Sequence, residues 1–433
     1  MVSAALESPV SGRRLSSVVP AEVTGDNKDF ELSSMDLAMK LHYIKGVYFF
    51  QSEAVQGVSG SDLKEPMFRW LEFYFTTSGR IRRSSGTGRP FIKCNDAGVR
   101  IVEAHCDSKT IDEWLATSDH SLDHLLAHDQ VLGPDLGFSP LVFLQFTWFR
   151  SGGVSIGLSW AHVLGDAFSA SAFINLWGQI MAGQVPPKSL QVHNPENSEL
   201  PTSICRKPCS LKKVDPVGDC WLTANNHNMQ TYSFHVTEKQ LHHIVSSTRD
   251  PGQTDSISHF EILSSIIWHS LSKLREDMGP RIVTICSNNS LIRENEMPTN
   301  GMIFSTVEAD FCVSKGEITE LAKLIAEKRM PENGLVEELL RDEARSDFIV
   351  YGANLTFVDL EEANLYGLEL KGKRPMFVNY TINGVGDEGT VLILPGPENE
   401  GGSGKIVTMT LPEDQLAKLK NILGHDWNIA KPT

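Results

Sequence analysis

The residues best suited to chemistry are a histidine and an aspartate four positions apart, His162 and Asp166. Of the 14 histidines in the chain, only His162 has an aspartate at this spacing. Residues 154–160 alternate apolar with small or polar side chains, which is typical of a strand, and apolar residues from Phe168 onwards recur at helical spacing. The pattern predicts a strand-to-helix corner that could hold an imidazole as a general base. It also fits a buried structural histidine beside an aspartate at a helix N-terminus.

The composition argues for a globular protein and against several classes of partner. The chain has 433 residues, of which 41% are hydrophobic and 21% charged, so two or three domains with ample core are expected. Its net charge of −15 disfavours a general nucleic-acid binder, which needs a basic face. The same charge disfavours an electrostatic anchor on anionic lipid. We expect no nucleic-acid partner.

Cysteine usage and hydropathy indicate a reducing compartment and no membrane span. The seven cysteines are scattered and form no C-x-x-C pair, so neither disulfides nor a zinc site is expected. The most apolar run, residues 141–149, contains Gln145 and Thr147 and is too short to cross a bilayer. It predicts a buried strand. Charged residues before position 15 argue against a signal peptide, and we expect a cytosolic protein.

Two halves are joined by a proline-rich connector. Six prolines interrupt any periodicity between residues 182 and 218, so residues 186–219 are predicted to link residues 1–185 to residues 220–433. Strands are predicted near 91–94, 99–103, 141–149, 230–236, 281–286, 303–311, 376–382, 390–394 and 405–411. Helices are predicted near 63–78, 237–247, 256–274, 316–329 and 412–423.

Glycine motifs in the sequence do not stand in the context that nucleotide cofactors or α/β-hydrolase chemistry require. Residues 401–405, Gly-Gly-Ser-Gly-Lys, invite a phosphate-loop interpretation, but Asn399 stands where the motif needs glycine and Ile406 where it needs Ser or Thr. A G-x-G-x-x-G stands at residues 384–389 after a predicted strand, but the strand predicted at 390–394 follows it where the dinucleotide motif needs a helix. A G-x-S-x-G stands at residues 153–157, but its serine lies inside the predicted strand and not at a strand-to-helix turn. We expect no permanently bound cofactor and no metal.

Four stretches, together with the H-x-x-x-D corner and the connector, resemble the plant BAHD acyltransferases over nearly the whole chain. Within that family the chain resembles the Eceriferum/Glossy-type cuticular wax proteins. The stretches are residues 14–20 (RLSSVVP), 35–43 (MDLAMKLHY), 131–136 (VLGPDL) and 351–358 (YGANLTFV). The resemblance implies an α/β fold of two chloramphenicol-acetyltransferase-like domains, each of mixed sheet plus helices, with a channel between them. It also implies that a segment near 355–380 crosses from the second half to pack with the first.

The resemblance assigns roles to the corner residues. His162 would remove a proton from an acceptor hydroxyl or amine as it attacks the thioester of an acyl-CoA, which would be a substrate or ligand. Asp166 would orient the loop from a position turned away from that channel, usually through an arginine. The departures are Ala167 in place of the motif glycine and the lack of arginine in residues 285–289.

The second family motif, DFGWG, is replaced by residues 369–375, Glu-Leu-Lys-Gly-Lys-Arg-Pro. Its basic residues Lys371, Lys373 and Arg374 are candidates for contact with CoA phosphates or with an acidic patch on a partner. They also fit a solvated turn after a strand. The altered motif puts ordinary CoA-dependent turnover in doubt, so whether the chain is an enzyme stays open at this point.

Three functions therefore compete. The Eceriferum/Glossy resemblance implies an accessory role in very-long-chain fatty-acid elongation for cuticular wax. There the chain would act with the condensing enzyme, 3-ketoacyl-CoA synthase, at the cytoplasmic face of the endoplasmic reticulum, held by that partner. His162 instead favours an acyl-CoA-dependent acyltransferase with this residue as general base. An unrelated interaction protein is the third hypothesis.

Overall fold

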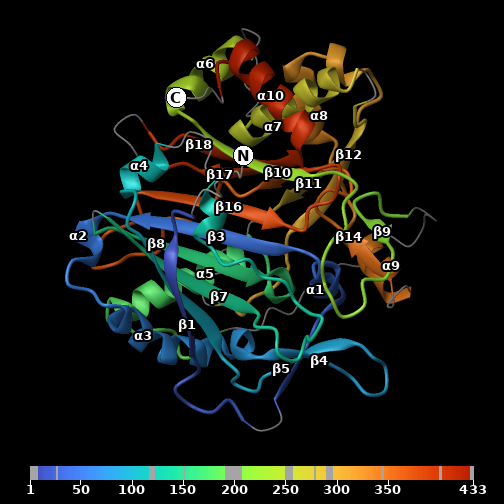
Figure 1. The fold of residues 1–433 in the computed structure, drawn as a ribbon. Helices are drawn as coiled ribbons and strands as arrows, with labels where there is room; N and C mark the ends of the chain where they lie inside the picture. The colour runs from blue at the N-terminus through green and yellow to red at the C-terminus, as the bar shows by residue number, and fades with distance from the viewer. Residues whose placement is uncertain are drawn as a thin grey trace, which may run out of the picture.

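The computed structural model describes most of the chain (Figure 1). The described residues are 8–25, 28–116, 122–150, 152–190, 207–248, 257–276, 279–288, 296–342, 346–398 and 402–429.

Two large mixed sheets organise the fold, and two small sheets flank them. The six-stranded sheet has the order β1 (Ser11–Val18), β6 (Val99–Cys106), β7 (Val142–Phe149), β8 (Val154–Ala161), β3 (Tyr43–Phe50) and β16 (Phe377–Asn383). The seven-stranded sheet has the order β10 (Met229–Val236), β18 (Lys405–Pro412), β17 (Thr390–Pro395), β15 (Leu355–Asp359), β11 (Ile282–Ser287), β12 (Ile303–Glu308) and β13 (Met330–Pro331). The small sheets pair β14 (Asp347–Ile349) with β9 (Lys212–Val214), and order β2 (Asp29–Glu31), β5 (Pro90–Lys93) and β4 (Arg80–Arg83).

Helices cover these sheets. In the first half they are α1 (Ser34–Ala38), α2 (Ser52–Val55), α3 (Gly60–Phe73), α4 (Ile111–Leu115) and α5 (Ala167–Met181). In the second half they are α6 (Glu238–Thr248), α7 (His259–Leu274), α8 (Ile318–Glu327), α9 (Asn333–Asp342) and α10 (Glu413–Asp426). The predicted α/β class of mixed sheets plus helices is confirmed.

The predicted strand-to-helix corner is present, between β8 and α5. Every residue of β8 is buried, because the strand is central in its sheet with β7 on one side and β3 on the other. The predicted strand over 141–149 is β7. Helix α5 packs on α3, where the Trp70 indole lies 4.0 Å from the Phe173 ring (centroid distance) and donates a hydrogen bond to the Phe173 carbonyl. The corner is thus fixed by a sheet on one side and by helix packing on the other.

A segment of the second half joins the first sheet. β16 pairs antiparallel with β3 over seven residues, and the two strands lie side by side in Figure 1. Before β16 the chain crosses α5, where Asn175 donates to the Asn364 carbonyl (2.8 Å). β15, at the start of the segment that was expected to cross, stays in the second sheet. The division of the chain at residues 185 and 220 stays a prediction.

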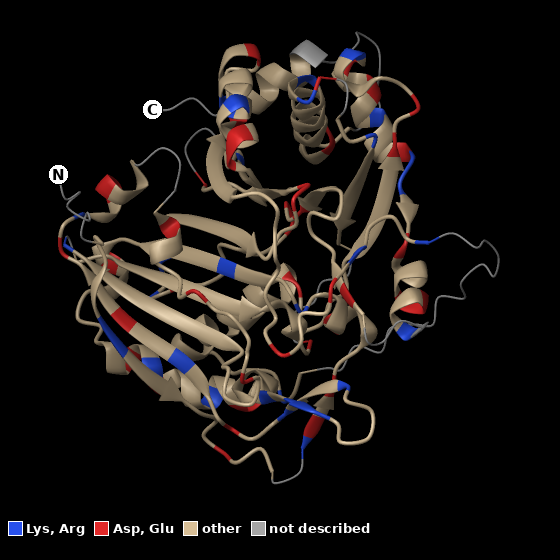
Figure 2. Cartoon of the chain, turned by 45° about the vertical axis from the view of Figure 1, so that its right-hand side comes forward, with Lys and Arg blue, Asp and Glu red and all other residues tan. Residues whose placement is uncertain are grey.

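Charged residues are unevenly distributed over the fold, and its helices are short. Figure 2 shows Lys, Arg, Asp and Glu mainly on helices, loops and sheet edges, with the strands of the second sheet largely free of them. The longest described helix, α7, has 16 residues. No helix in the described part of the chain combines the length and apolar character needed to cross a membrane.

The pairing of β3 with β16 yields a stability prediction at Gly46. A Cβ added there would lie 2.5 Å from Cε2 of Tyr380, a fully buried ring whose hydroxyl meets that of Tyr48 at 2.5 Å. We expect Gly46→Ala to destabilise the protein by about 1–3 kcal/mol, because a buried aromatic ring cannot move without repacking its neighbours. The measurement is the urea unfolding midpoint.

Gly86→Ala is the matched control. An added Cβ at Gly86 would have no atom within 4 Å, so its unfolding midpoint should equal that of the wild type. Equal midpoints for Gly46→Ala and Gly86→Ala would contradict the predicted packing constraint.

Candidate active site

The corner between β8 and α5 is a single tight turn that starts at His162. Residues His162–Leu164 form a short 3-10 turn, and Gly165 follows with φ of +154°. A Cβ on Gly165 would lie 2.8 Å from the Thr299 backbone nitrogen, so this position requires glycine. The Trp160 indole donates to the Gly165 carbonyl (2.8 Å), and the His162 backbone N–H donates to the His42 carbonyl (3.2 Å). The turn is therefore fixed by backbone contacts.

The imidazole of His162 is 1% exposed and has a partner at each ring nitrogen. Nδ1 lies 2.9 Å from Oδ1 of Asn300, and Nε2 lies 3.2 Å from the Tyr351 hydroxyl. Nδ2 of Asn300 donates to the His162 carbonyl (2.9 Å), so Oδ1 must be the acceptor for Nδ1–H. The proton therefore resides on Nδ1, and Nε2 accepts a hydrogen bond from Tyr351. A general base needs this tautomer.

Asn300 connects the corner to the first helix. Besides its bonds to His162, its Nδ2 donates to Oδ1 of Asp36 in α1 (2.9 Å). The other carboxylate oxygen of Asp36 accepts from the Ser33 backbone N–H (2.8 Å), which closes a capping box at the start of α1. Burial raises the pKa of Asp36 above its usual value. One amide thus joins three segments that are far apart in sequence.

A second histidine, His42, lies beside the pair. Its ring centroid is 5.0 Å from that of Tyr351 and 6.4 Å from that of His162. Its Nε2 accepts from the backbone N–H groups of Val350 (3.1 Å) and Tyr351 (3.4 Å). Burial lowers the pKa of His42 to about 3, lowers that of His162 and raises that of Tyr351, so all three rings are neutral near pH 7.

The carboxylate of Asp166 binds backbone N–H groups. Oδ1 accepts from Ser169 (3.1 Å) and caps α5, while Oδ2 accepts from Gly301 (3.1 Å). The Asp166 N–H donates to the Thr299 carbonyl (3.1 Å). Asp166 therefore attaches the 299–301 segment of the second half to the corner. Residues 285–289, which were expected to hold the family arginine, contain none, and of these residue 289 lies outside the described residues.

A polar cleft of about 550 Å³ lies between the two sheets. β3 and β16 contribute to one wall and β10 and β18 to the other, with Lys45, Asn379, Thr410 and Lys420 among the lining residues. His162 does not line this cleft. Asn383 and Gly384 line the cleft, and their backbone groups lie next to the His42 imidazole. His42 therefore lies between the cleft wall and His162. No cluster of metal-ligating side chains occurs in the described ranges.

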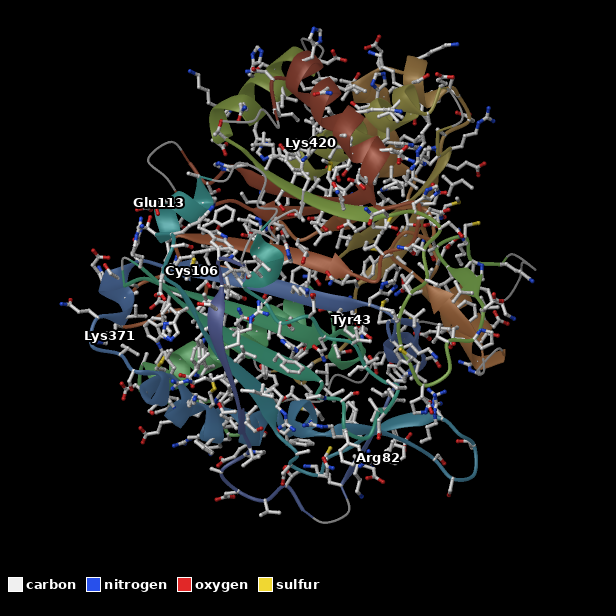
Figure 3. The ribbon with its side chains drawn as sticks, viewed as in Figure 1. Tyr43, Arg82, Cys106, Glu113, Lys371 and Lys420 are labelled. Atoms are coloured by element: carbon white, nitrogen blue, oxygen red, sulfur yellow. The ribbon has the colours of Figure 1, made fainter. Side chains whose placement is uncertain are left out.

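The basic cluster Lys371, Lys373 and Arg374 lies far from His162. The three side chains are exposed on a turn, where Lys371 donates to the Gln56 carbonyl (2.6 Å) and Arg374 pairs with Glu369 (3.3 Å). Gln56 follows α2, which comes directly after the end of β3, whereas His162 adjoins the start of that strand, where Tyr43 pairs with Ala161. Figure 3 shows Lys371 at the opposite side of the sheet from Tyr43. At about 3.3 Å per residue, the strand separates the two sites by roughly 20 Å.

The sequence analysis missed three residues of this site, namely Asn300, Tyr351 and His42. His42 and Tyr351 stand in two of the stretches that carried the family resemblance, but nothing in their local pattern marks them as neighbours of His162. Asn300 has no local signal at all. Tertiary contacts alone bring them together.

Comparison with known proteins shows the family to which the chain belongs. The model of the Transferase family matches residues 9–286, more than half of the chain. The chain therefore belongs to this family, the BAHD acyltransferases. It is 43% identical over 430 residues to Protein ECERIFERUM 2 of Arabidopsis thaliana, covering 95% of this chain and 97% of that protein. It is 40% identical over 415 residues to Protein ECERIFERUM 26-like of the same plant, covering 95% and 94%.

Other similarities are weaker. Shikimate O-hydroxycinnamoyltransferase of Nicotiana tabacum is 26% identical, over 87% of this chain and 91% of that protein. Among solved structures, vinorine synthase superposes with a TM-score of 0.69 at 16% identity, covering 94% of this chain and 96% of its own. TRI101 of F. sporotrichioides, solved with coenzyme A and T-2, gives a TM-score of 0.67 at 14% identity, covering 93% and 98%. These two structures share the fold.

The burial of neutral His42 predicts acid sensitivity. In the unfolded chain a histidine binds a proton below about pH 6.5, but the folded protein holds His42 neutral down to about pH 3. Between these values, falling pH favours the unfolded state. When the pH falls from 7.5 to 5.5, His42 should lower the free energy of unfolding of the wild type by about 1.4 kcal/mol. In His42→Gln, whose amide oxygen can accept the same N–H groups, this loss should be absent.

The measurement is urea unfolding at these two pH values. His227, which is exposed, provides the control, and His227→Gln should keep the acid sensitivity of the wild type. An unchanged pH dependence in His42→Gln would show that His42 does not titrate as expected from its burial.

Proposed function

We propose that this protein supports very-long-chain fatty-acid elongation for cuticular wax as a non-catalytic member of the acyltransferase fold. It would act with the elongase condensing enzyme, 3-ketoacyl-CoA synthase, and extend the product lengths which that enzyme reaches. The partner would hold it at the cytoplasmic face of the endoplasmic reticulum, and very-long-chain acyl-CoA would be its ligand.

One observation carries the proposal: the basic nitrogen of His162 already has a donor from the protein itself. Tyr351 contacts Nε2 and both side chains are buried, so no acceptor hydroxyl meets the base in this arrangement. The replaced second motif and the similarity to two ECERIFERUM proteins over nearly the whole chain support the same conclusion.

An accessory role of this kind has a sufficient driving force. Each methylene moved from water to an apolar surface contributes about 0.8 kcal/mol. A partner that shelters five further methylenes would therefore add roughly 4 kcal/mol to the binding of a longer chain. Such a role depends on shape and interface and needs no general base.

The second candidate is an acyl-CoA-dependent acyltransferase that moves an acyl group to a hydroxyl or amine. The observation that favours it is the tautomer of His162, because Asn300 keeps the proton on Nδ1 and leaves Nε2 basic. In that mechanism Nε2 would take the acceptor proton, and loss of the base would cost about 10²–10⁴-fold in rate.

The two candidates predict different results for His162→Ala. If the role is non-catalytic, we expect this variant to retain more than about half of the wild-type very-long-chain output, since the β3–β16 pairing and the Asp166 contact with Gly301 still join the two halves. The measurement is the fatty-acid length profile of a host that expresses one condensing enzyme with the wild type, the variant or an empty control.

His227→Ala, at an exposed histidine, serves as the matched variant, and the abundance and melting temperature of each protein are measured in parallel. If His162→Ala is folded and abundant but its profile equals that of the empty control, the non-catalytic role is wrong and acyl transfer becomes the first candidate.

Charge reversal tests the basic turn. Lys371→Glu, Lys373→Glu and Arg374→Glu together should lower affinity for the condensing enzyme at least about tenfold if the turn contacts an acidic patch of that partner. Since the three side chains are exposed and their contacts contribute little to stability, we expect only a small change in the melting temperature. Co-purification and acyl-CoA binding are both measured, and unchanged values for both would mean that the turn is only a solvated surface.

A further inference from the structure

We propose that Tyr351 is an internal stopper of the active site: its hydroxyl occupies the position where an acceptor hydroxyl would meet His162. The inference rests on the family's acyl-transfer chemistry and on contacts in this chain. It does not depend on the elongation role.

The first argument is geometric. The Tyr351 hydroxyl is 3.2 Å from Nε2, which is the distance expected for an alcohol about to give up its proton. Because Asn300 holds the proton on Nδ1, Nε2 can only accept, and the phenol is the donor that it accepts from. The protein has therefore placed one of its own O–H groups where a substrate O–H would bind.

The second argument is that Tyr351 is held in place. Its backbone N–H donates to His42, its carbonyl accepts from the Gly386 N–H (2.9 Å), and its ring packs edge-on against that of His42. The side chain is 1% exposed. A phenol with a raised pKa also stays protonated, so it remains a donor to Nε2 across physiological pH.

The third argument concerns space. Gly386 follows Gly384 and Val385, which line the 550 Å³ cleft, so the backbone of Tyr351 adjoins the segment that forms the cleft wall. Replacement of the phenol by a methyl group would remove the side chain that covers Nε2. Water or a small alcohol could then reach the base.

The reaction gained would be acyl transfer from an acyl-CoA thioester. Nε2 takes the proton of the acceptor as its oxygen bonds to the thioester carbon. The C–S bond then breaks, and the imidazolium returns the proton to the leaving thiolate. The products are free CoA and an acid or ester, so no further reactant is needed.

Two readouts on the full-length protein test the stopper. Free thiol release from acetyl-CoA and palmitoyl-CoA, in water and with added methanol, measures turnover. Modification of His162 by diethyl pyrocarbonate, located by peptide mass spectrometry, measures access to the imidazole. We expect Tyr351→Ala to release thiol at least about 10²-fold faster than the wild type, and Tyr351→Ala with His162→Ala to lose that gain. We expect His162 to be modified in Tyr351→Ala and not in the wild type.

Two further variants separate the hydroxyl from the ring. Tyr351→Phe vacates only the position of the hydroxyl and keeps the ring in the path to Nε2, so the site should stay closed to an acceptor, with no gain in turnover. Tyr366→Ala removes a tyrosine whose hydroxyl accepts from Val378 N–H, away from His162, and should also show no gain. Melting temperatures confirm that each variant is folded.

The proposal is overturned if the wild type already matches Tyr351→Ala in turnover or in modification of His162. It is equally overturned if folded Tyr351→Ala leaves His162 unmodified, or shows modification without His162-dependent thiol release. The elongation profile of the wild type is measured separately, so failure of the elongation role would leave these results intact.

Discussion

The docking of the two halves depends on one constraint: both ring nitrogens of the buried His162 imidazole need a hydrogen-bond partner. An unpaired polar atom in such a place costs roughly 1–3 kcal/mol, so the groups around His162 have to be supplied from somewhere. The first half supplies the corner itself, whereas the second half supplies Asn300 and Tyr351. Neither half can bury His162 favourably alone, and the site therefore forms only when the two sheets are docked.

The same docking is reinforced away from the ring. β16 adds a strand of the second half to the first sheet, and the residues before it cross α5. Asp166 extends this arrangement, since one carboxylate caps α5 and also receives the Gly301 N–H. Asp166 thus holds the backbone on both sides of Asn300, while Asp36 and the His162 carbonyl hold its side chain. A substrate channel in this fold would have to open within a junction that hydrogen bonds hold on several sides.

Local sequence patterns predicted much of the fold and little of the site. Hydrophobic periodicity predicted the β8–α5 corner, the buried β7 and the strands β17 and β18. Each of these segments is clearly more apolar than the loops that flank it in sequence. Helix α9 was missed although Val336 and Leu340 are spaced for it, and β9 and β14 have only three residues each, too few for a periodic signal. The partners of His162 could not be predicted, since Asn300 and Tyr351 are 138 and 189 residues away in sequence.

If the protein is non-catalytic as proposed, the site explains why a histidine–aspartate pair would be kept. Asp166 stabilises a helix N-terminus and a contact between halves, and both are needed whatever His162 does. His162 in turn binds Asn300 and Tyr351 and so takes part in the hydrogen bonding of the junction. The residues that make a general base are therefore also residues that hold the fold together. Under the proposed accessory role, loss of turnover would require only that a donor cover Nε2, and Tyr351 alone would provide one.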